Sequence, residues 1–131
     1  MSYKIVLDAG HGGTDPGAIY KERKEKDDNL ELTRAVGKIL EDNGIDVVYT
    51  RTTDVYQTPF EKARIANEVG ADYFISFHRN SSPKENQYQG VEVLVYDEGG
   101  LFHFLSSEQQ PGGESVQWSG GAGLRQIRCE I

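Results

Sequence analysis

Two of the chain's 3 histidines stand where a short apolar segment ends. His11 lies between glycines just after the run at 3–8, and His78 follows the run at 72–77. If both runs are neighbouring parallel strands, their carboxyl ends meet at one edge of the sheet, where ligand sites of open α/β sheets lie. Neutral imidazoles are the commonest zinc ligands. His11 could instead be incidental in a glycine turn, and His78 could be a buried, hydrogen-bonded histidine, but the pair favours a metal site.

Glu25 is the candidate for a third ligand. It belongs to the charged run KEKD at 24–27, and such a run is usually a solvated surface. Its position, just before a predicted helix and close to the loop that carries His11, favours a metal-binding role instead. Two histidines and one carboxylate leave a fourth tetrahedral position for water, which is the pattern of a catalytic zinc. Zinc lowers the pKa of bound water toward about 7 and polarises carbonyl groups.

Three further polar residues could support this site or contact a substrate. Asp8 could hold His11 in one tautomer, or it could cap the turn that follows the strand. Arg51 could contact a substrate or form a structural ion pair with the acidic loop. Asn80 could orient His78 or a substrate.

The elements that must position these residues alternate between strand and helix. Thr58, Pro59 and Glu61 have the spacing of a capping box with proline at the first helical position. The long glycine-rich and charged loop at 9–26 is of a length that usually serves function. The pattern predicts strands at 3–8, 45–51, 72–77 and 90–96 and helices at 28–43 and 58–70. This alternation predicts an α/β fold with a mostly parallel sheet flanked by helices.

The character of the sequence changes after residue 98. Residues 99–131 contain nearly half of the 15 glycines and none of the 7 tyrosines. We therefore predict a core at 1–98 and a tail at 99–131 rich in glycine, serine and glutamine, irregular apart from a turn of helix or short strand at 101–105. The abrupt shift suggests a shifted reading frame or a recombined end, and a diverged tail is the alternative. His103, in this tail, is interpreted as incidental.

Composition narrows the class of protein. With 37% hydrophobic and 27% charged residues, the chain of 131 residues has the composition of a soluble globular domain. Its net charge of -7 argues against nucleic-acid binding, and no apolar run is long enough to span a membrane. One cysteine excludes a disulfide framework within the chain. No secretory leader is visible, so we expect a cytoplasmic location before release, or export by another route.

Seven ordered motifs together resemble one enzyme family. They are IVLDAGHGG at 5–13, DPGA at 15–18, KEKD at 24–27, VYTR at 48–51, RIAN at 64–67, FISFHRN at 74–80 and GVE at 90–92. In this order and spacing they resemble the zinc-dependent N-acetylmuramoyl-L-alanine amidases of the amidase-3 type, over about residues 3–96. The resemblance implies a three-layer fold with a mixed sheet, and zinc bound by His11, Glu25 and His78. The implied reaction hydrolyses the amide between N-acetylmuramic acid and L-alanine in peptidoglycan, at the bacterial cell wall.

The tail departs from this family. The family has a later strand ending in a general-base glutamate, followed by further helical structure, and the sequence after residue 98 shows no match to that pattern. We therefore expect the fold to be incomplete at the C-terminus, and we identify no general base from sequence.

Three alternative functions follow from these residues. The first is a truncated homologue that binds zinc and wall fragments without cutting them. The second is a serine esterase, since His11 and the glycines after it resemble a lipase oxyanion loop, but the required Gly-x-Ser-x-Gly elbow is absent from the sequence. The third is a phosphate-binding loop, which needs other glycine spacings and a helix that starts at once.

Overall fold

A six-stranded sheet forms the centre of the computed structural model, which describes the backbone of residues 3–79, 92–96, 103–106 and 125–130 and the side chains of 3–79. The sheet strands are β1 (Lys4–Ala9), β4 (Asp46–Tyr49), β5 (Tyr73–His78), β6 (Glu92–Tyr96), β7 (His103–Ser106) and β8 (Arg125–Glu130). The remaining elements are the hairpin of β2 (Ile19–Tyr20) and β3 (Arg23–Lys24) and the helices α1 (Glu25–Asp42) and α2 (Pro59–Val69).

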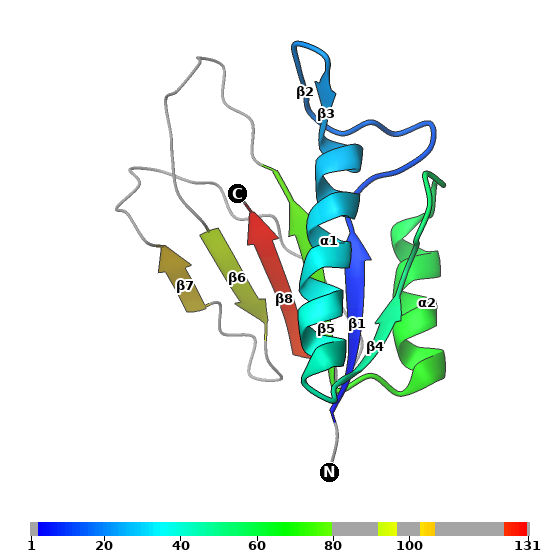
Figure 1. Ribbon diagram of the computed structural model, residues 1–131, viewed down its shortest axis with the longest axis vertical. Helices are drawn as coiled ribbons and strands as arrows, with labels where there is room; N and C mark the ends of the chain where they lie inside the picture. The colour runs from blue at the N-terminus through cyan, green and yellow to red at the C-terminus, as the bar shows by residue number, and fades with distance from the viewer. Residues whose placement is uncertain (1–2, 80–91, 97–102, 107–124, 131) are drawn as a thin grey trace.

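The strands lie in the order β4-β1-β5-β8-β6-β7, so that β4 and β7 form the two edges (Figure 1). Strands β4, β1, β5 and β8 run parallel to their neighbours, whereas β6 pairs antiparallel with both β8 and β7. The predicted fold class, a mostly parallel mixed sheet flanked by helices, is confirmed. Since β1 and β5 are adjacent and parallel, their carboxyl ends meet at one edge, as the two histidines require.

Alternate residues of β1 point to opposite faces of the sheet and build two cores. Ile5 and Leu7 pack on one face with apolar side chains of α1, and Val6 packs on the other with Ala66 of α2. Leu7 and Val6 are both fully buried. The central strand is therefore covered on both sides, which is why its sequence is a continuous apolar run rather than an alternating one.

The two long helices begin differently. Helix α2 starts with the predicted capping box between Thr58 and Glu61 and ends at Gly70, whose φ of 63° is left-handed. Helix α1 starts at Glu25, earlier than predicted, and its N-cap Lys24 makes no side-chain cap bond. Two backbone bonds fix this start instead, from the N–H of Glu25 to the carbonyl of Ala18 and from the N–H of Lys26 to that of Pro16, because the preceding loop folds back onto the helix.

The region after residue 98 contains more regular structure than the sequence predicts. Besides β7, which overlaps the short segment predicted at 101–105, the stretch from Arg125 to Glu130 forms a strand between β5 and β6. The expectation of irregular structure is wrong for this segment. Ile127 and Cys129 alternate with polar residues there, a period of two that is too short to recognise in isolation. Within the described residues, no helix combines the length and apolarity needed to cross a membrane.

A buried charged pair joins β1 to α2. Lys62 lies 3.0 Å from Oδ1 of Asp8, and the two side chains are only 10% and 4% exposed. The hydroxyls of Thr50 and Ser76 donate to the two oxygens of Asp8 at 2.8 and 2.6 Å. The carboxylate is therefore fully coordinated by groups from three neighbouring elements, as a buried charge must be.

Removing the cation of this pair is expected to destabilise the fold strongly. Lys62→Ala leaves Asp8 buried without a counter-charge, which should lower the free energy of unfolding by about 3–5 kcal/mol. Lys38→Ala is the matched control, because Lys38 pairs with Asp42 on the surface, where both side chains are mostly exposed. Loss of such a pair costs at most about 1 kcal/mol. Urea denaturation measures both changes, and equal effects would contradict the assignment of Lys62.

Candidate metal centre

The three predicted ligands converge at the carboxyl edge of the sheet. His11 follows β1, His78 ends β5 and Glu25 opens α1. One ligand atom from each lies within 4.8 Å of the others. Nε2 of His11 is 3.0 Å and Nδ1 of His78 is 3.2 Å from the same oxygen, Oε1 of Glu25. The ring centroids of the histidines are 5.0 Å apart and nearly perpendicular. The two rings therefore direct different nitrogens, Nε2 of His11 and Nδ1 of His78, toward the same carboxylate oxygen of Glu25.

Glycines let the backbone come close enough for this geometry. A Cβ on Gly10 would lie 2.4 Å from the His78 ring, and one on Gly17 would lie 2.6 Å from Oε2 of Glu25. His11 itself has a φ of 64°, the left-handed region that favours glycine, within a tight turn that pairs Gly12 with Asp15. The glycines of the loop therefore leave room for the side chains of His78 and Glu25 to lie directly against its backbone.

Glu25 is a buried carboxylate with many donors. Its side chain is 4% exposed, and it accepts hydrogen bonds from the backbone N–H groups of Ala18 and Arg79 and from the Asn29 amide. Burial works against its charged form, but bonds from His11, His78 and the two backbone groups hold the pKa of Glu25 well below its ordinary value. Glu25 is therefore an anion in the folded protein. In the part of the chain whose side chains are described, it pairs with no lysine or arginine.

His11 has a second carboxylate partner, Asp15. Its Nδ1 lies 2.8 Å from Oδ2 of Asp15, and since an ionised carboxylate only accepts, Nδ1 carries a proton. The bond to Glu25 raises the pKa of His11 above its ordinary value; partial burial opposes this and the bond to Asp15 adds to it. The bond from His11 likewise lowers the pKa of Asp15.

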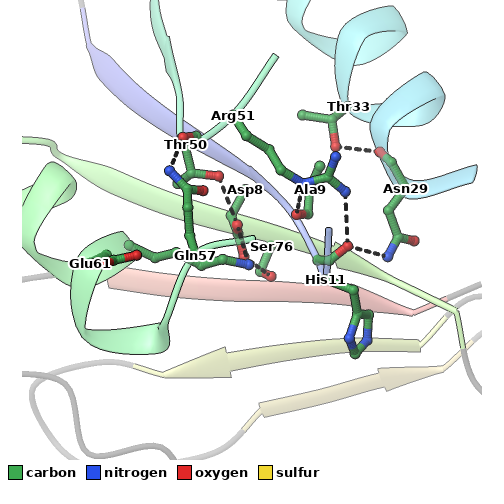
Figure 2. Close-up of polar contacts among 12 residues, drawn as sticks. Asp8, Ala9, His11, Asn29, Thr33, Thr50, Arg51, Gln57, Glu61 and Ser76 are labelled. Carbon is green, nitrogen blue, oxygen red and sulfur yellow. Dashed lines mark hydrogen bonds and ion pairs between the residues drawn. The ribbon is translucent and has the colours of Figure 1, made fainter. Parts of the chain in front are cut away.

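Asp8 does not orient His11. Its carboxylate binds Thr50, Ser76 and Lys62, beside α2, and Figure 2 shows it directed away from His11. The prediction that Asp8 sets the His11 tautomer is wrong, because Asp8 lies two residues after Val6 in β1 and so shares the face that α2 covers. The carboxylate that contacts the His11 ring on its Nδ1 side is that of Asp15, which lies in the DPGA motif.

Arg51 clamps the loop that carries His11. Its side chain donates to the backbone carbonyl of Ala9 at 3.1 Å (Figure 2) and to those of Gly10, Lys26 and Thr53 at 2.9–3.2 Å. The residue is 4% exposed, and its burial lowers the pKa of the guanidinium. Arg51 therefore holds the His11 loop in place through backbone carbonyls, and among the described side chains it forms no ion pair. Asn80 lies outside the described residues.

A second clamp that the sequence analysis missed involves Asp54. Its carboxylate accepts from the N–H of Gly13 and from the Lys26 ammonium, both at 2.7 Å. Lys26 also donates to the carbonyl of Gly13. The bond to Lys26 lowers the pKa of Asp54. Nothing in the local sequence marks these residues, because the loop of Gly13, the first turn of α1 with Lys26 and the loop of Asp54 meet only in the fold.

One glutamate of the tail reaches the same edge of the sheet. Strand β8 pairs in parallel with β5, and its last residue, Glu130, is the register partner of His78. Neighbouring strands are about 4.8 Å apart, so this backbone position is next to a predicted ligand. Glu92, at the start of β6, is in turn the partner of Glu130. The proximity of Glu130 to His78 depends entirely on strand pairing, so it could not be predicted from the residues around Glu130.

Known proteins share both the sequence and the fold of this chain. The profile of the N-acetylmuramoyl-L-alanine amidase family matches residues 5–118, a range that runs past the predicted division at residue 98. The sporulation-specific N-acetylmuramoyl-L-alanine amidase of Bacillus subtilis is 37% identical over 74% of this chain, and the endolysin of Bacillus phage SPP1 is 43% identical over 63%. These matches cover 37% and 31% of the two relatives, so the chain spans about a third of their length.

A solved structure agrees with these sequence matches. The crystal structure of N-acetylmuramoyl-L-alanine amidase from Clostridium difficile 630 superposes with a TM-score of 0.67 and 36% identity, covering 70% of this chain and 51% of that one. The catalytic domain of CwlV from Bacillus (Paenibacillus) polymyxa covers 98% of this chain with a TM-score of 0.70. At 22% identity, this second likeness concerns the fold alone.

Proposed function

The chain belongs to the amidase-3 family of N-acetylmuramoyl-L-alanine amidases, and we propose that it hydrolyses the amide between N-acetylmuramic acid and L-alanine in peptidoglycan, as a zinc enzyme of the bacterial cell wall. The observation that carries this proposal is the convergence of His11, Glu25 and His78 at the carboxyl edge of the sheet. Ligand sites of open α/β sheets lie at this edge.

The donor set fits zinc. Two imidazole nitrogens and one carboxylate oxygen, with a fourth position left for water, are the usual ligands of a hydrolytic zinc. The buried Glu25 anion also needs a compensating positive charge, and the described side chains offer it only the two histidines. A divalent cation would supply that charge while the histidines become neutral. Zinc bound here would polarise a carbonyl and lower the pKa of water.

Other residues of the chain hold the Glu25 carboxylate and the His11 loop in place. Asn29 and the N–H groups of Ala18 and Arg79 hold the Glu25 carboxylate in place, so that little reorganisation is needed during reaction. Arg51 keeps the His11 loop rigid from beneath. The attacking water adds to the lactyl carbonyl of the muramic acid, and the bond to the nitrogen of L-alanine then breaks.

We assign the proton transfer to Glu130. A general base must come within about 2.6–3.2 Å of the proton it abstracts, directly or through one water. Glu130 ends the strand next to β5, in register with His78, and this support is independent of any sequence motif around it. The base would take the proton of the attacking water and return it to the leaving nitrogen.

Digestion of purified peptidoglycan tests the proposed activity. The zinc-loaded chain is incubated with the polymer and the soluble products are weighed by mass spectrometry. We expect free stem peptides that begin with L-alanine, and their release should stop after chelation and return when zinc is added. No release, beside release by a longer relative under the same conditions, would contradict the proposal and favour a zinc-binding protein that does not cut.

A further inference from the structure

Asp15 contacts His11 on the side of the ring that faces away from Glu25. Oδ2 of Asp15 is 2.8 Å from Nδ1 of His11, while Nε2 of the same ring is 3.0 Å from Oε1 of Glu25. The imidazole thus lies between two carboxylates, one at each nitrogen. An ionised carboxylate faces each nitrogen; a metal at Nε2 would replace the proton there and leave the one on Nδ1 with Asp15.

From this geometry we infer that Asp15 is the positioning residue of the site: it keeps the His11 proton on Nδ1 and so leaves Nε2 free to bind the metal. This inference rests on the proposed function, in that it assumes zinc at His11. Without Asp15, Glu25 is the only carboxylate partner of the ring in the described structure, and the proton moves to Nε2. A metal ion then has to displace a proton from the atom it needs.

Asp15 also connects the first two ligands along the loop. Its other oxygen, Oδ1, accepts from the N–H of Gly17 at 3.1 Å. The next residue, Ala18, donates its N–H to Oε2 of Glu25 at 2.8 Å. One carboxylate therefore orients His11 directly and fixes the backbone that orients Glu25. Carboxylate partners of metal-binding histidines set both ring orientation and ligand basicity, and their loss typically costs about 10–100-fold in metal affinity.

The chain offers a matched control for the effect of the loop alone. Asp54 also ties down this loop, through the N–H of Gly13, but the structure gives it no contact with a histidine. Both aspartates have substantially exposed side chains, 44% for Asp15 and 50% for Asp54, so neither alanine variant opens a buried cavity. If Asp15 only stabilises the loop, Asp15→Ala and Asp54→Ala should lose similar amounts of zinc affinity. If Asp15 sets the His11 tautomer, Asp15→Ala should lose more zinc affinity than Asp54→Ala.

The test measures zinc affinity by chelator competition in the wild type, Asp15→Ala and Asp54→Ala. We expect Asp15→Ala to weaken zinc binding by about 10–100-fold and Asp54→Ala to change it much less. Long-range proton–nitrogen NMR of the metal-free chains, at a pH where His11 holds a single proton, adds a readout of its tautomer. His11 should carry its proton on Nδ1 in the wild type and in Asp54→Ala, and on Nε2 in Asp15→Ala.

Two outcomes would overturn the inference: equal losses of zinc affinity in both variants, or an unchanged His11 tautomer in Asp15→Ala. Asp15→Asn adds a graded comparison, because a neutral amide oxygen is a weaker acceptor than a carboxylate and should give an intermediate affinity. Failure of the proposed function looks different, since the wild type itself would then bind no zinc.

Discussion

Replacement of His78 by alanine is expected to abolish tight zinc binding. The ring supplies one of three protein ligands, and its Nδ1 faces the same point as Nε2 of His11. Loss of a group that merely orients a ligand costs about 10–100-fold in metal affinity, so loss of the ligand itself should exceed about 100-fold. Competition with a chromophoric chelator measures the affinity directly, without requiring turnover.

The third histidine provides the control for this experiment. His103 lies in β7, at the far edge of the sheet and three strands away from β5. His103→Ala should therefore bind zinc as tightly as the wild type. Because the His78 ring packs against Gly10, circular dichroism of the metal-free variant must first show that the fold persists. A folded His78→Ala chain with unchanged zinc affinity would refute the assignment of all three ligands.

The central fold could be predicted because its signals are local. The apolar runs around Val6 and Phe74, with capped helical patterns between them, specify buried parallel strands and their crossovers. The start of α1 was misplaced because its first turn has no side-chain cap. Backbone bonds with Pro16 and Ala18, earlier in the same loop, fix that end, and the pattern of residue types does not reveal them.

The site could be predicted only in part. The convergence of His11 and His78 follows from the parallel sheet, whereas Glu25 was chosen over its charged neighbours mainly by its position, and the family resemblance then implied the same ligand. The contacts of Asp15 with His11 and of Arg51 with the loop backbone could not be predicted from the sequence. These contacts depend on how the loop at 9–26 folds back on itself, and the residue types of a loop do not specify its conformation.

The tail shows the limit of reasoning from composition. A glycine-rich segment without a sustained period predicts irregular structure, yet six residues of it complete the sheet between β5 and β6. Pairing with two neighbouring strands supplies backbone hydrogen bonds to both edges of β8, so that its own sequence needs little strand propensity. The division of the chain at residue 98 stays a prediction.

Replacement of Glu130 by glutamine is expected to reduce turnover while zinc binding persists. Glutamine keeps the size of the side chain but cannot accept a proton at neutral pH, and general-base catalysis typically contributes about 10²–10⁴-fold to the rate. The released stem peptides, followed over time by mass spectrometry, should therefore appear more slowly by about this factor. Zinc affinity should match that of the wild type, because His11, Glu25 and His78 are all retained in this variant.

Glu92→Gln is the matched control for this variant. Glu92 lies opposite Glu130 on β6, one strand further from His78, so it shares the sheet edge but not the neighbouring position. If Glu92→Gln slows turnover while Glu130→Gln does not, the base has been assigned to the wrong strand. If both variants cut at the wild-type rate, neither glutamate takes the proton. A selective loss at Glu130 would mean that strand pairing alone, without the family's sequence context, supplies the base of this site.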